Sequence, residues 1–240
     1  MSLGDQARYS ARTHVGLTRS VNEDSVLSLP ELSLWLVSDG MGGHDGGDYA
    51  SRLICDMVAG LAFDRSPGDR LRDVRDLLQR AHDAIRKEAE ARGGVTIGAT
   101  VVTLLMAQDH FACLWAGDSR CYRLREGKIE LLTADHSMVA GMVAAGWMDW
   151  DEADQHPQSN AITRAVGVGD ELELDKVGGG LQEGDRFLLC SDGLTKYATF
   201  AMLQSILTQT PIETVADQLV QVALDGGGAD NISVIVVDAL

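Results

Sequence analysis

Short apolar runs alternate along the chain with longer stretches in which apolar residues recur every three or four positions. The runs predict β-strands and the recurring pattern predicts amphipathic helices, because side chains share a face at a period of about 2 in a strand and about 3.6 in a helix. Strands are predicted at 9–15, 25–29, 34–39, 100–107, 111–116, 121–124, 129–132, 171–177, 186–190 and 232–237. Helices are predicted at 48–61, 69–91, 200–208 and 212–224. His82, on the second of these helices, is expected to be at the surface or partly covered.

The connections between successive strands indicate an antiparallel arrangement. Residues 108–110 and 125–128 are short enough to close hairpins between the strands that flank them. A parallel sheet of the Rossmann type needs a crossover helix between neighbouring strands, and these links have no room for one. Antiparallel sheets are therefore expected.

Residues 135–169 interrupt this pattern. The segment 135–137 can cap a short helix, and another short helix is predicted at 151–156. Trp147 and Trp150 lie between the two. The segment is too short for a hydrophobic core of its own. We therefore interpret it as a lobe appended to a single domain, in which the tryptophans are expected to pack the lobe onto the body, with contact to a partner as the alternative.

Composition and charge argue against several kinds of partner. Hydrophobic residues make up 45% of the chain and charged residues 23%, which is typical of a globular protein. The formal net charge of −16 argues against nucleic acid and anionic membranes, because both require basic patches. No apolar stretch reaches the roughly 18 to 20 residues of a membrane span, and no basic and apolar leader opens the chain. The cysteines lack Cys-x-x-Cys spacing and are predicted to be buried and reduced, which fits a cytoplasmic location.

Four aspartates stand at the ends of predicted strands. Asp39, Asp118 and Asp192 follow apolar runs, and Asp230 precedes one. A single aspartate followed by glycine, as in Asp39-Gly40, is explained equally well as a turn. Four carboxylates at the same kind of position instead predict a convergent, oxygen-rich site for hard cations.

The connector between the first two predicted strands carries charges of both signs. Arg19, Glu23 and Asp24 precede the strand that ends at Asp39. Isolated charges of this kind are usually solvated loop residues. Their position just before the Asp39 strand also allows them to share its site.

Seven short motifs resemble, in the same order, those of the metal-dependent serine/threonine protein phosphatases of type 2C, the PPM family, and especially its compact bacterial members. The motifs lie at residues 19–25, 38–43, 98–100, 116–120, 135–137, 189–194 and 229–233. Each motif alone is a weak signal, but the seven together span almost the whole chain.

The resemblance implies an α/β fold of the α+β type. The expected architecture is a four-layer α-β-β-α sandwich, with two mainly antiparallel β-sheets flanked by helices. It implies one catalytic domain over residues 1–240, in which residues 135–169 are the variable flap beside the site. The order of the predicted elements agrees with this arrangement.

The resemblance also implies a centre for two divalent cations, Mn²⁺ or Mg²⁺. In the family pattern, the residue that matches Asp39 bridges both ions. Asp192 and Asp230 would complete one ion. The Gly40 carbonyl and, through water, Glu23 would serve the other.

Further residues match supporting positions of the family. Asp118, together with Asp192, matches the position of a weaker third ion in bacterial relatives. Arg19 matches the arginine that binds the substrate phosphate, so Arg19 and Asp39 are the expected catalytic residues. Asp24 and Asn231 are expected to support the metal ligands from behind.

This assignment is chemically consistent. Carboxylates, a backbone carbonyl and waters suit Mg²⁺ and Mn²⁺, whereas Zn²⁺ favours the histidine and cysteine that these motifs lack. Two ions about 3.5 to 4 Å apart can share a water, lower its pKa and orient it for in-line attack on phosphorus. The guanidinium of Arg19 can bind two phosphate oxygens. The expected reaction is hydrolysis of phosphoserine or phosphothreonine without a covalent phosphoenzyme.

One position departs from many members of the family. Eukaryotic members often have a histidine after the first Asp-Gly, proposed as the general acid, whereas this chain has Met41. A thioether cannot donate a proton. His44 and His136 are near in sequence or motif order, but neither is expected to be a direct substitute. The leaving oxygen would then be protonated by a metal-bound water, by another group or by solvent.

Two alternatives compete with this interpretation. A phosphatase of the haloacid dehalogenase type needs a second aspartate two residues after the first, where this chain has Met41 and Leu194, so it is excluded. A catalytically weak or inactive phosphatase-fold protein could instead bind phosphoproteins as a regulator. The presence of all four strand-end aspartates disfavours this second alternative. The expected partners of an active enzyme are phosphoserine and phosphothreonine proteins, and its expected role in signalling is to oppose a serine/threonine kinase.

Overall fold

Two β-sheets form the centre of residues 7–42 and 46–240, which the computed structural model describes. The first sheet contains, in spatial order, β1 (Ala7–His14), β11 (Ile232–Ala239), β10 (Arg186–Cys190), β7 (Arg120–Arg125) and β8 (Lys128–Leu131). The second contains β2 (Asp24–Leu29), β3 (Leu34–Gly42), β5 (Val101–Ala107), β6 (His110–Ala116) and β9 (Asp175–Gly180), with β4 (Ile97–Ala99) paired to β3. The strand pairs are antiparallel, as the short links predicted.

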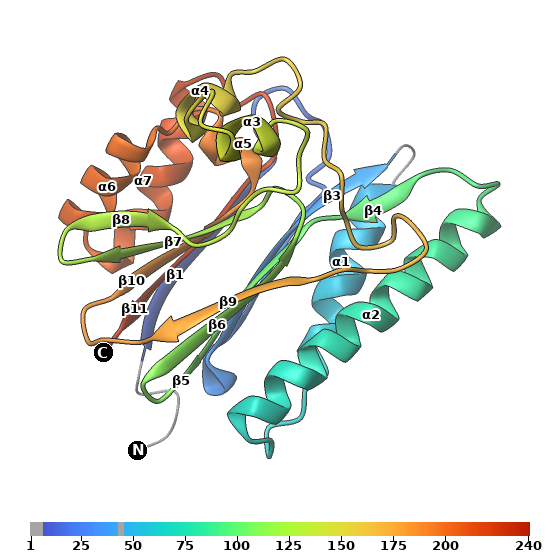
Figure 1. The fold of residues 1–240 in the computed structure, drawn as a ribbon, viewed down its shortest axis with the longest axis horizontal. Helices are drawn as coiled ribbons and strands as arrows, with labels where there is room; N and C mark the ends of the chain where they lie inside the picture. The colour runs from blue at the N-terminus through green and yellow to red at the C-terminus, as the bar shows by residue number, and fades with distance from the viewer. Residues whose placement is uncertain (1–6, 43–45) are drawn as a thin grey trace.

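Pairs of helices cover the outer faces of the two sheets (Figure 1). The helices α1 (Gly46–Ala59) and α2 (Pro67–Ala91) pack on the second sheet. The helices α6 (Phe200–Gln209) and α7 (Ile212–Asp225) pack on the first. The described part of the chain is therefore a four-layer α-β-β-α sandwich, which confirms the predicted fold class.

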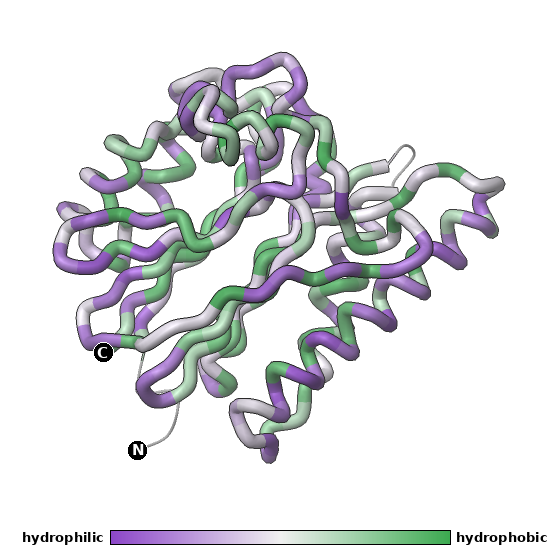
Figure 2. The backbone as a smooth tube through the Cα atoms, viewed as in Figure 1, coloured by the Kyte–Doolittle hydropathy of each residue, from purple (hydrophilic) through white to green (hydrophobic). Residues whose placement is uncertain are grey.

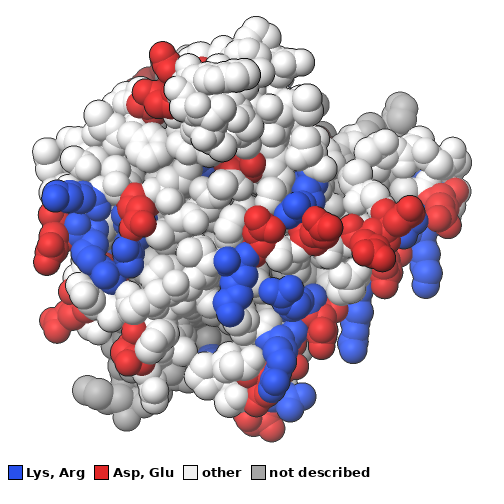
Figure 3. Space-filling view, viewed as in Figure 1, with Lys and Arg blue, Asp and Glu red and all other residues white. Residues whose placement is uncertain are grey.

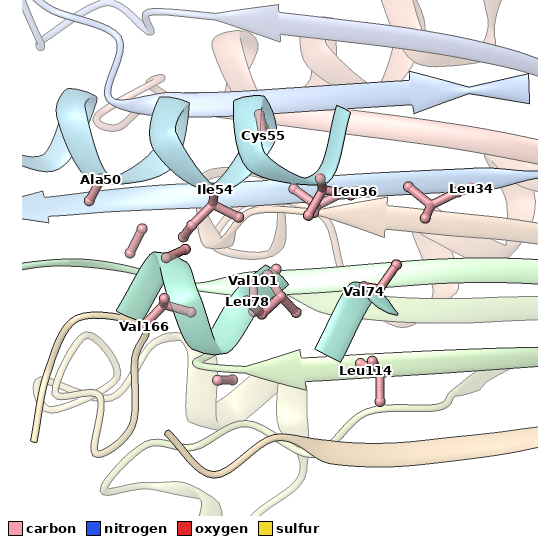
Figure 4. Close-up of a cluster of buried hydrophobic side chains, with 14 of the residues drawn as sticks. Leu34, Leu36, Ala50, Ile54, Cys55, Val74, Leu78, Val101, Leu114 and Val166 are labelled. Atoms are coloured by element: carbon pink, nitrogen blue, oxygen red, sulfur yellow. The ribbon is translucent and has the colours of Figure 1, made fainter. Parts of the chain in front are cut away.

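Apolar side chains fill the interfaces between the layers. In β3, Leu34 and Leu36 pack with the helices on the outer face, as Figure 4 shows, whereas Trp35 and Val37 pack in the cluster between the sheets. Figure 2 shows hydrophobic positions concentrated in the central strands and a mixture of hydrophobic and hydrophilic positions along α2. Because the central strands are covered on both faces, functional side chains are left to the strand ends and loops.

The segment 135–169 contains two short helices, α3 (Ala140–Ala144) and α4 (Trp150–Asp154). In Figure 1 these helices lie beside α5 (Asp192–Thr195), at the strand ends. The centre of the Trp150 ring lies 4.7 Å from the guanidinium carbon of Arg120, whereas Trp147 is 77% exposed. Trp150 therefore packs the segment onto the body and Trp147 does not.

The predicted strands need two corrections. The strand predicted at 171–177 is β9, at Asp175–Gly180, and the short β4 at Ile97–Ala99 was not predicted. The three glycines that end β9 lie beside β6, where a Cβ atom on Gly178 would be 2.9 Å from the carbonyl oxygen of Phe111. Glycine disfavours strands in general, so the close approach of two backbones overrides the local preference.

Two predictions for individual residues are also wrong. Residues 135–137 do not cap α3, because Ser137 forms a β-bridge with Ile162 and the helix begins only at Ala140. His82 is fully buried rather than at the surface. Its Nδ1 accepts a hydrogen bond of 2.9 Å from the backbone N–H of Gly167, so the end of the 135–169 segment covers this helix position.

The surface carries charges of both signs. On the face drawn in Figure 3, lysine and arginine side chains are interspersed with aspartate and glutamate. Of the helices that the structure describes, none combines the length and apolar character that a membrane crossing needs.

Candidate active site

The predicted carboxylates meet in one pocket at the ends of both sheets. Asp39 lies near the end of β3, Asp192 follows β10, Asp230 precedes β11 and Asp118 lies between β6 and β7. The pocket has a volume of about 250 Å³. It is lined by Arg19, Glu23, Asp39, Gly40, Met41, Gly42, Thr100, Asp118, Asn160, Ile162, Asp192, Asp230 and Asn231. Every site residue predicted from the sequence is in this lining except Asp24, which lies behind it.

Thr100 fixes the backbone of Asp39. The N–H of Asp39 donates to Thr100 Oγ1 at 3.0 Å, and the N–H of Thr100 donates to the Asp39 carbonyl at 2.8 Å. Ser38 Oγ donates to the Thr100 carbonyl at 2.7 Å, and Thr100 Oγ1 and Ser119 Oγ are 2.7 Å apart. This buried network fixes the backbone from which the Asp39 carboxylate lines the pocket and links it to the loop that carries Asp118.

Glycines bring Glu23 and Gly40 close to the start of α1. A Cβ atom on Gly40 would lie 2.2 Å from the carbonyl oxygen of Gly47, and a Cβ on Gly47 would lie 2.6 Å from Glu23 Oε1. Burial raises the pKa of Glu23, whereas Arg19 and the N–H groups of Gly47 and Asp48 lower it. The first turn of α1 thus stabilises the Glu23 carboxylate, as the N-terminus of a helix does for an anion.

Asn231 organises the loop that carries Arg19 and Glu23. Its amide nitrogen donates to the carbonyls of Val15 and Val21 at 2.9 and 3.0 Å, and its Oδ1 accepts from the N–H of Glu23 at 2.8 Å. All three hydrogen bonds join Asn231, just before β11, to the connector between β1 and β2. Asn231 thus ties the loop that carries Arg19 and Glu23 to the start of β11.

Asp24 occupies a buried position opposite Asp39 in the β2–β3 ladder. Its Oδ2 accepts a hydrogen bond of 2.8 Å from Ser191 Oγ, and its Oδ1 has no hydrogen-bond partner among the described residues. Burial, together with the carboxylates of Asp192 and Asp230, raises the pKa of Asp24 to about 7 against the hydrogen bonds that lower it. An uncompensated buried carboxylate marks a place where positive charge would be stabilising.

The other carboxylates show the same need for positive charge. Burial raises the pKa of Asp39 well above its ordinary value, and the nearby carboxylates of Asp24 and Asp192 raise it further. Burial and Asp192 do the same for Asp118. Mutual repulsion among acids that share one pocket is what a multivalent cation relieves.

Two cationic side chains already contact these acids. The fork of Arg19 binds Asp230, with Nε 3.0 Å from Oδ1 and Nη2 3.1 Å from Oδ2. Lys196 Nζ lies 2.7 Å from Asp192 Oδ2 and 3.4 Å from Asp230 Oδ2. Lys196 was not among the predicted site residues, although its position four residues after Asp192 in a helical turn is a recognisable pairing signal.

The residues of the pocket fit hard divalent cations. Their donors are carboxylates and the Gly40 carbonyl, which suit Mn²⁺ and Mg²⁺. Among residues 7–42 and 46–240, no three acidic, histidine or cysteine side chains already form a metal-binding group. Arg19 binds the carboxylate of Asp230 and Lys196 contacts those of Asp192 and Asp230, so bound metal ions would share these carboxylates with the two cationic side chains.

His136 does not take the place of a proton donor beside Met41, because it is not among the residues that line the pocket. Met41 lines the pocket. The ring of His136 stacks on that of Trp115, with 6.0 Å between the ring centres. Its Nδ1 accepts a hydrogen bond of 3.1 Å from the Gly117 N–H, and its Nε2 lies 3.3 Å from Asp175 Oδ2. These contacts hold the His136 ring in a position where it does not line the pocket. His44 and Gly43 lie outside the described residues.

An acidic, oxygen-rich pocket at the ends of two antiparallel sheets flanked by helices is the arrangement that the resemblance to the metal-dependent phosphatases of type 2C implied. A family model described as protein phosphatase 2C matches residues 17–231, so the chain belongs to this family. This confirms the resemblance seen in the motifs.

Named relatives agree with this membership. The chain is 36% identical over 234 residues to the serine/threonine protein phosphatase PstP of Mycobacterium tuberculosis (strain H37Rv), and the match covers 97% of this chain and 45% of PstP. It is 32% identical over 236 residues to the serine/threonine phosphatase stp of Listeria innocua, with 95% of this chain and 94% of that protein covered. The chain thus spans about half the length of PstP and nearly all of the shorter relative.

Solved structures of similar proteins share the fold. PppA, a regulatory component of the type VI secretion system in Pseudomonas aeruginosa, superposes with a TM-score of 0.90 at 40% identity, over 98% of each chain. The catalytic domain of PstP in complex with two manganese ions superposes with a TM-score of 0.88 at 34% identity, over 98% of this chain and 99% of that one.

Proposed function

We propose that this chain is a metal-dependent protein phosphatase that hydrolyses phosphoserine and phosphothreonine. The observation that carries the proposal is the convergence of Asp39, Asp118, Asp192 and Asp230 from both sheets on one pocket that Arg19 also lines. We further propose that residues 1–240 act as one catalytic domain and that residues 135–169 are its flap. Membership of the family and the names of the relatives support this activity.

Two divalent cations, Mn²⁺ or Mg²⁺, would be held by Asp39, Asp192, Asp230, the Gly40 carbonyl and Glu23. When bound, these ions supply an activated water for in-line attack on phosphorus without a covalent intermediate. Asp118 together with Asp192 would hold a weaker third ion. The relative with two manganese ions supports the choice of cation.

Arg19 would bind and orient the phosphate. Its side chain is 52% exposed and reaches the pocket while it pairs with Asp230. When the guanidinium leaves the two carboxylate oxygens of Asp230, it can bind two phosphate oxygens in the same fork geometry. Its positive charge offsets the charge that develops on those oxygens in the transition state.

The partners and location follow from the same proposal. The substrates would be proteins phosphorylated on serine or threonine, and the enzyme would oppose a serine/threonine kinase in signalling. The four cysteines, Cys55, Cys113, Cys121 and Cys190, are all described, buried and free. Free thiols are typical of reducing compartments, which supports a cytoplasmic location.

The test is phosphate release from p-nitrophenyl phosphate and from a phosphothreonine peptide, with Mn²⁺ or with EDTA. Activity should require the metal and should be lost in Asp39→Asn and Asp192→Asn. The exposed acid Glu183 lies away from the pocket, so Glu183→Gln is the matched control for removing a negative charge. A wild-type protein that binds the phosphopeptide with no metal-dependent turnover would favour the regulator alternative instead.

A further inference from the structure

Lys196 places a positive charge between two of the expected metal ligands. It follows directly after α5, which begins at Asp192. Its ammonium contacts Asp192 Oδ2 at 2.7 Å and Asp230 Oδ2 at 3.4 Å, and its side chain is only 18% exposed. Burial lowers the pKa of Lys196, but the two carboxylates outweigh burial and raise it, so the side chain stays charged at physiological pH.

The backbone around Lys196 is fixed on both sides. Its N–H donates to the Asp192 carbonyl at 3.1 Å, which closes the turn of α5. Its own carbonyl accepts a hydrogen bond of 2.9 Å from Gln155 Nε2, at the end of α4. Asp151 on the same helix accepts from the N–H of Phe200 at 3.0 Å. The flap thus holds the segment that carries Lys196, and the ammonium is not a freely moving surface charge.

Lys196 also borders the position expected for the third ion. A second small cavity, of about 10 Å³, is lined by both Asp118 and Asp192 and by Lys196. A cavity of this size holds about one water-sized particle. A divalent ion placed between Asp118 and Asp192 would therefore lie beside the ammonium and would share the Asp192 carboxylate with it.

We infer that Lys196 is a built-in cation of the metal centre that compensates Asp192 and Asp230 and weakens the binding of a third divalent ion. The inference rests on the proposed two-metal centre and concerns a residue outside its ligand set. A positive charge a few ångströms from a divalent ion is repulsive, and the ammonium also takes one of the oxygens that the ion would use. The shorter of its two contacts is with Asp192, which the third ion would share with Asp118, so the third ion is the one whose binding the ammonium weakens most.

The effect of removing this charge on the melting temperature should differ with and without metal. Replacing Lys196 by the uncharged, similarly long methionine removes the counter-charge of Asp192 and Asp230 when EDTA is present, so the melting temperature should fall. With saturating Mn²⁺, the extra ion should take the place of the ammonium, and the difference in melting temperature should disappear or reverse. A merely structural role would lower the melting temperature by a similar amount in both conditions.

The test counts Mn²⁺ ions by calorimetry and by the electron paramagnetic resonance signal of free Mn²⁺. Wild type, Lys196→Met, Lys196→Arg and the exposed-site control Lys128→Met are compared. We expect two tight ions in every variant, and a third ion that binds at least about tenfold more tightly in Lys196→Met only. An unchanged or weakened third site in a folded Lys196→Met protein would overturn the inference.

The same titration separates this inference from the proposed function. Asp39→Asn should abolish the two tight sites. If wild type itself binds no Mn²⁺, the two-metal centre is wrong and the inference falls with it. If wild type binds two ions and Lys196→Met binds a third no better than wild type, only the role of Lys196 is overturned.

Discussion

Arg120 on β7 binds Asp154 on α4 through two parallel hydrogen bonds, of 2.9 Å from Nη1 to Oδ2 and 2.7 Å from Nη2 to Oδ1. The same guanidinium binds Asp135 through Nε and Nη2 at 2.9 and 2.8 Å, and its side chain is 2% exposed. Asp135 and Asp154 belong to the start and the middle of the flap. One buried arginine therefore fastens the flap two residues away from Asp118.

Asp154→Asn should loosen this attachment. The loss of a charged hydrogen-bond pair should lower the free energy of unfolding by about 1.5–3 kcal/mol, because Asp135 still compensates Arg120. We expect KM for a phosphothreonine peptide to rise more than KM for p-nitrophenyl phosphate, since a peptide is long enough to reach the proposed flap and the small ester is not. Urea unfolding and steady-state kinetics measure the two effects, with Glu183→Gln as the control. Equal changes in KM for both substrates would contradict a role of the flap in substrate selection.

Asn231→Ala should disturb the loop that carries Arg19 and Glu23. It removes the donor to the carbonyls of Val15 and Val21 and the acceptor for Glu23 N–H. The free energy of unfolding should fall by at least about 1–3 kcal/mol, because backbone groups are left without partners. Activity should fall even at temperatures where the variant is fully folded by circular dichroism. Full activity of the folded variant would show that the loop holds its shape without Asn231.

The strand ends could be predicted from the sequence because they are local. Asp39, Asp192 and Asp230 each adjoin an apolar run, and a strand that is buried on both faces shows as such a run. The antiparallel order followed from the short links. The acids that line the pocket could therefore be predicted from the sequence alone.

Contacts between distant segments could not be predicted in this way. The burial of His82 depends on the backbone of Gly167, and β9 depends on the fit of its glycines against Phe111. Lys196 is four residues from Asp192, but its contact with Asp230 needs β10 and β11 to be neighbours. Single-sequence patterns report which face a residue occupies and not which segment covers it.

The fall in stability with rising pH should flatten or change sign when metal binds. The pKa of Asp24 is about 7 in the folded protein, above its ordinary value of 3.8. The folded state thus holds a proton on Asp24 more tightly than the unfolded state does. The stability that protonated Asp24 contributes is fully present below about pH 4 and is lost as pH rises through about 7. The pKa values of Asp39 and Asp118 are raised in the same direction.

In EDTA we therefore expect the melting temperature to fall between pH 5 and pH 8, and Asp24→Asn should make the fall shallower. With saturating Mn²⁺ the slope should flatten or change sign, because bound cations stabilise the ionised carboxylates. Thermal unfolding over this pH range, with and without metal, provides the measurement. An identical slope in the two conditions would show that these carboxylates do not bind the metal.

Arg19→Ala should affect the binding of phosphate more than the binding of metal. Loss of the fork removes a charged donor to the transition state, so kcat/KM should fall by about 10²- to 10³-fold. Arg19→Lys should recover only part of the loss, because an ammonium does not bind two oxygens in one plane. Steady-state kinetics give the first quantity, and Mn²⁺ titration shows whether the metal sites are intact. A large loss of metal affinity in Arg19→Lys would indicate that Arg19 acts mainly by positioning Asp230.

Met41→His tests how the leaving oxygen is protonated. Met41 lines the pocket next to Gly40, and its thioether has no proton to give. An imidazole with an ordinary pKa near 6.5 would add a donor whose protonated form is lost above that pH. We expect the variant to change the limb of the pH–rate profile between about pH 5 and 8 for a phosphothreonine peptide, whose alkoxide needs a proton. The change should be small for p-nitrophenyl phosphate, whose leaving phenolate is stable without one. Met41→Leu, with the wild-type profile, controls for the altered volume, and a Met41→His profile that matches it for both substrates would remove this position as the site of the acid.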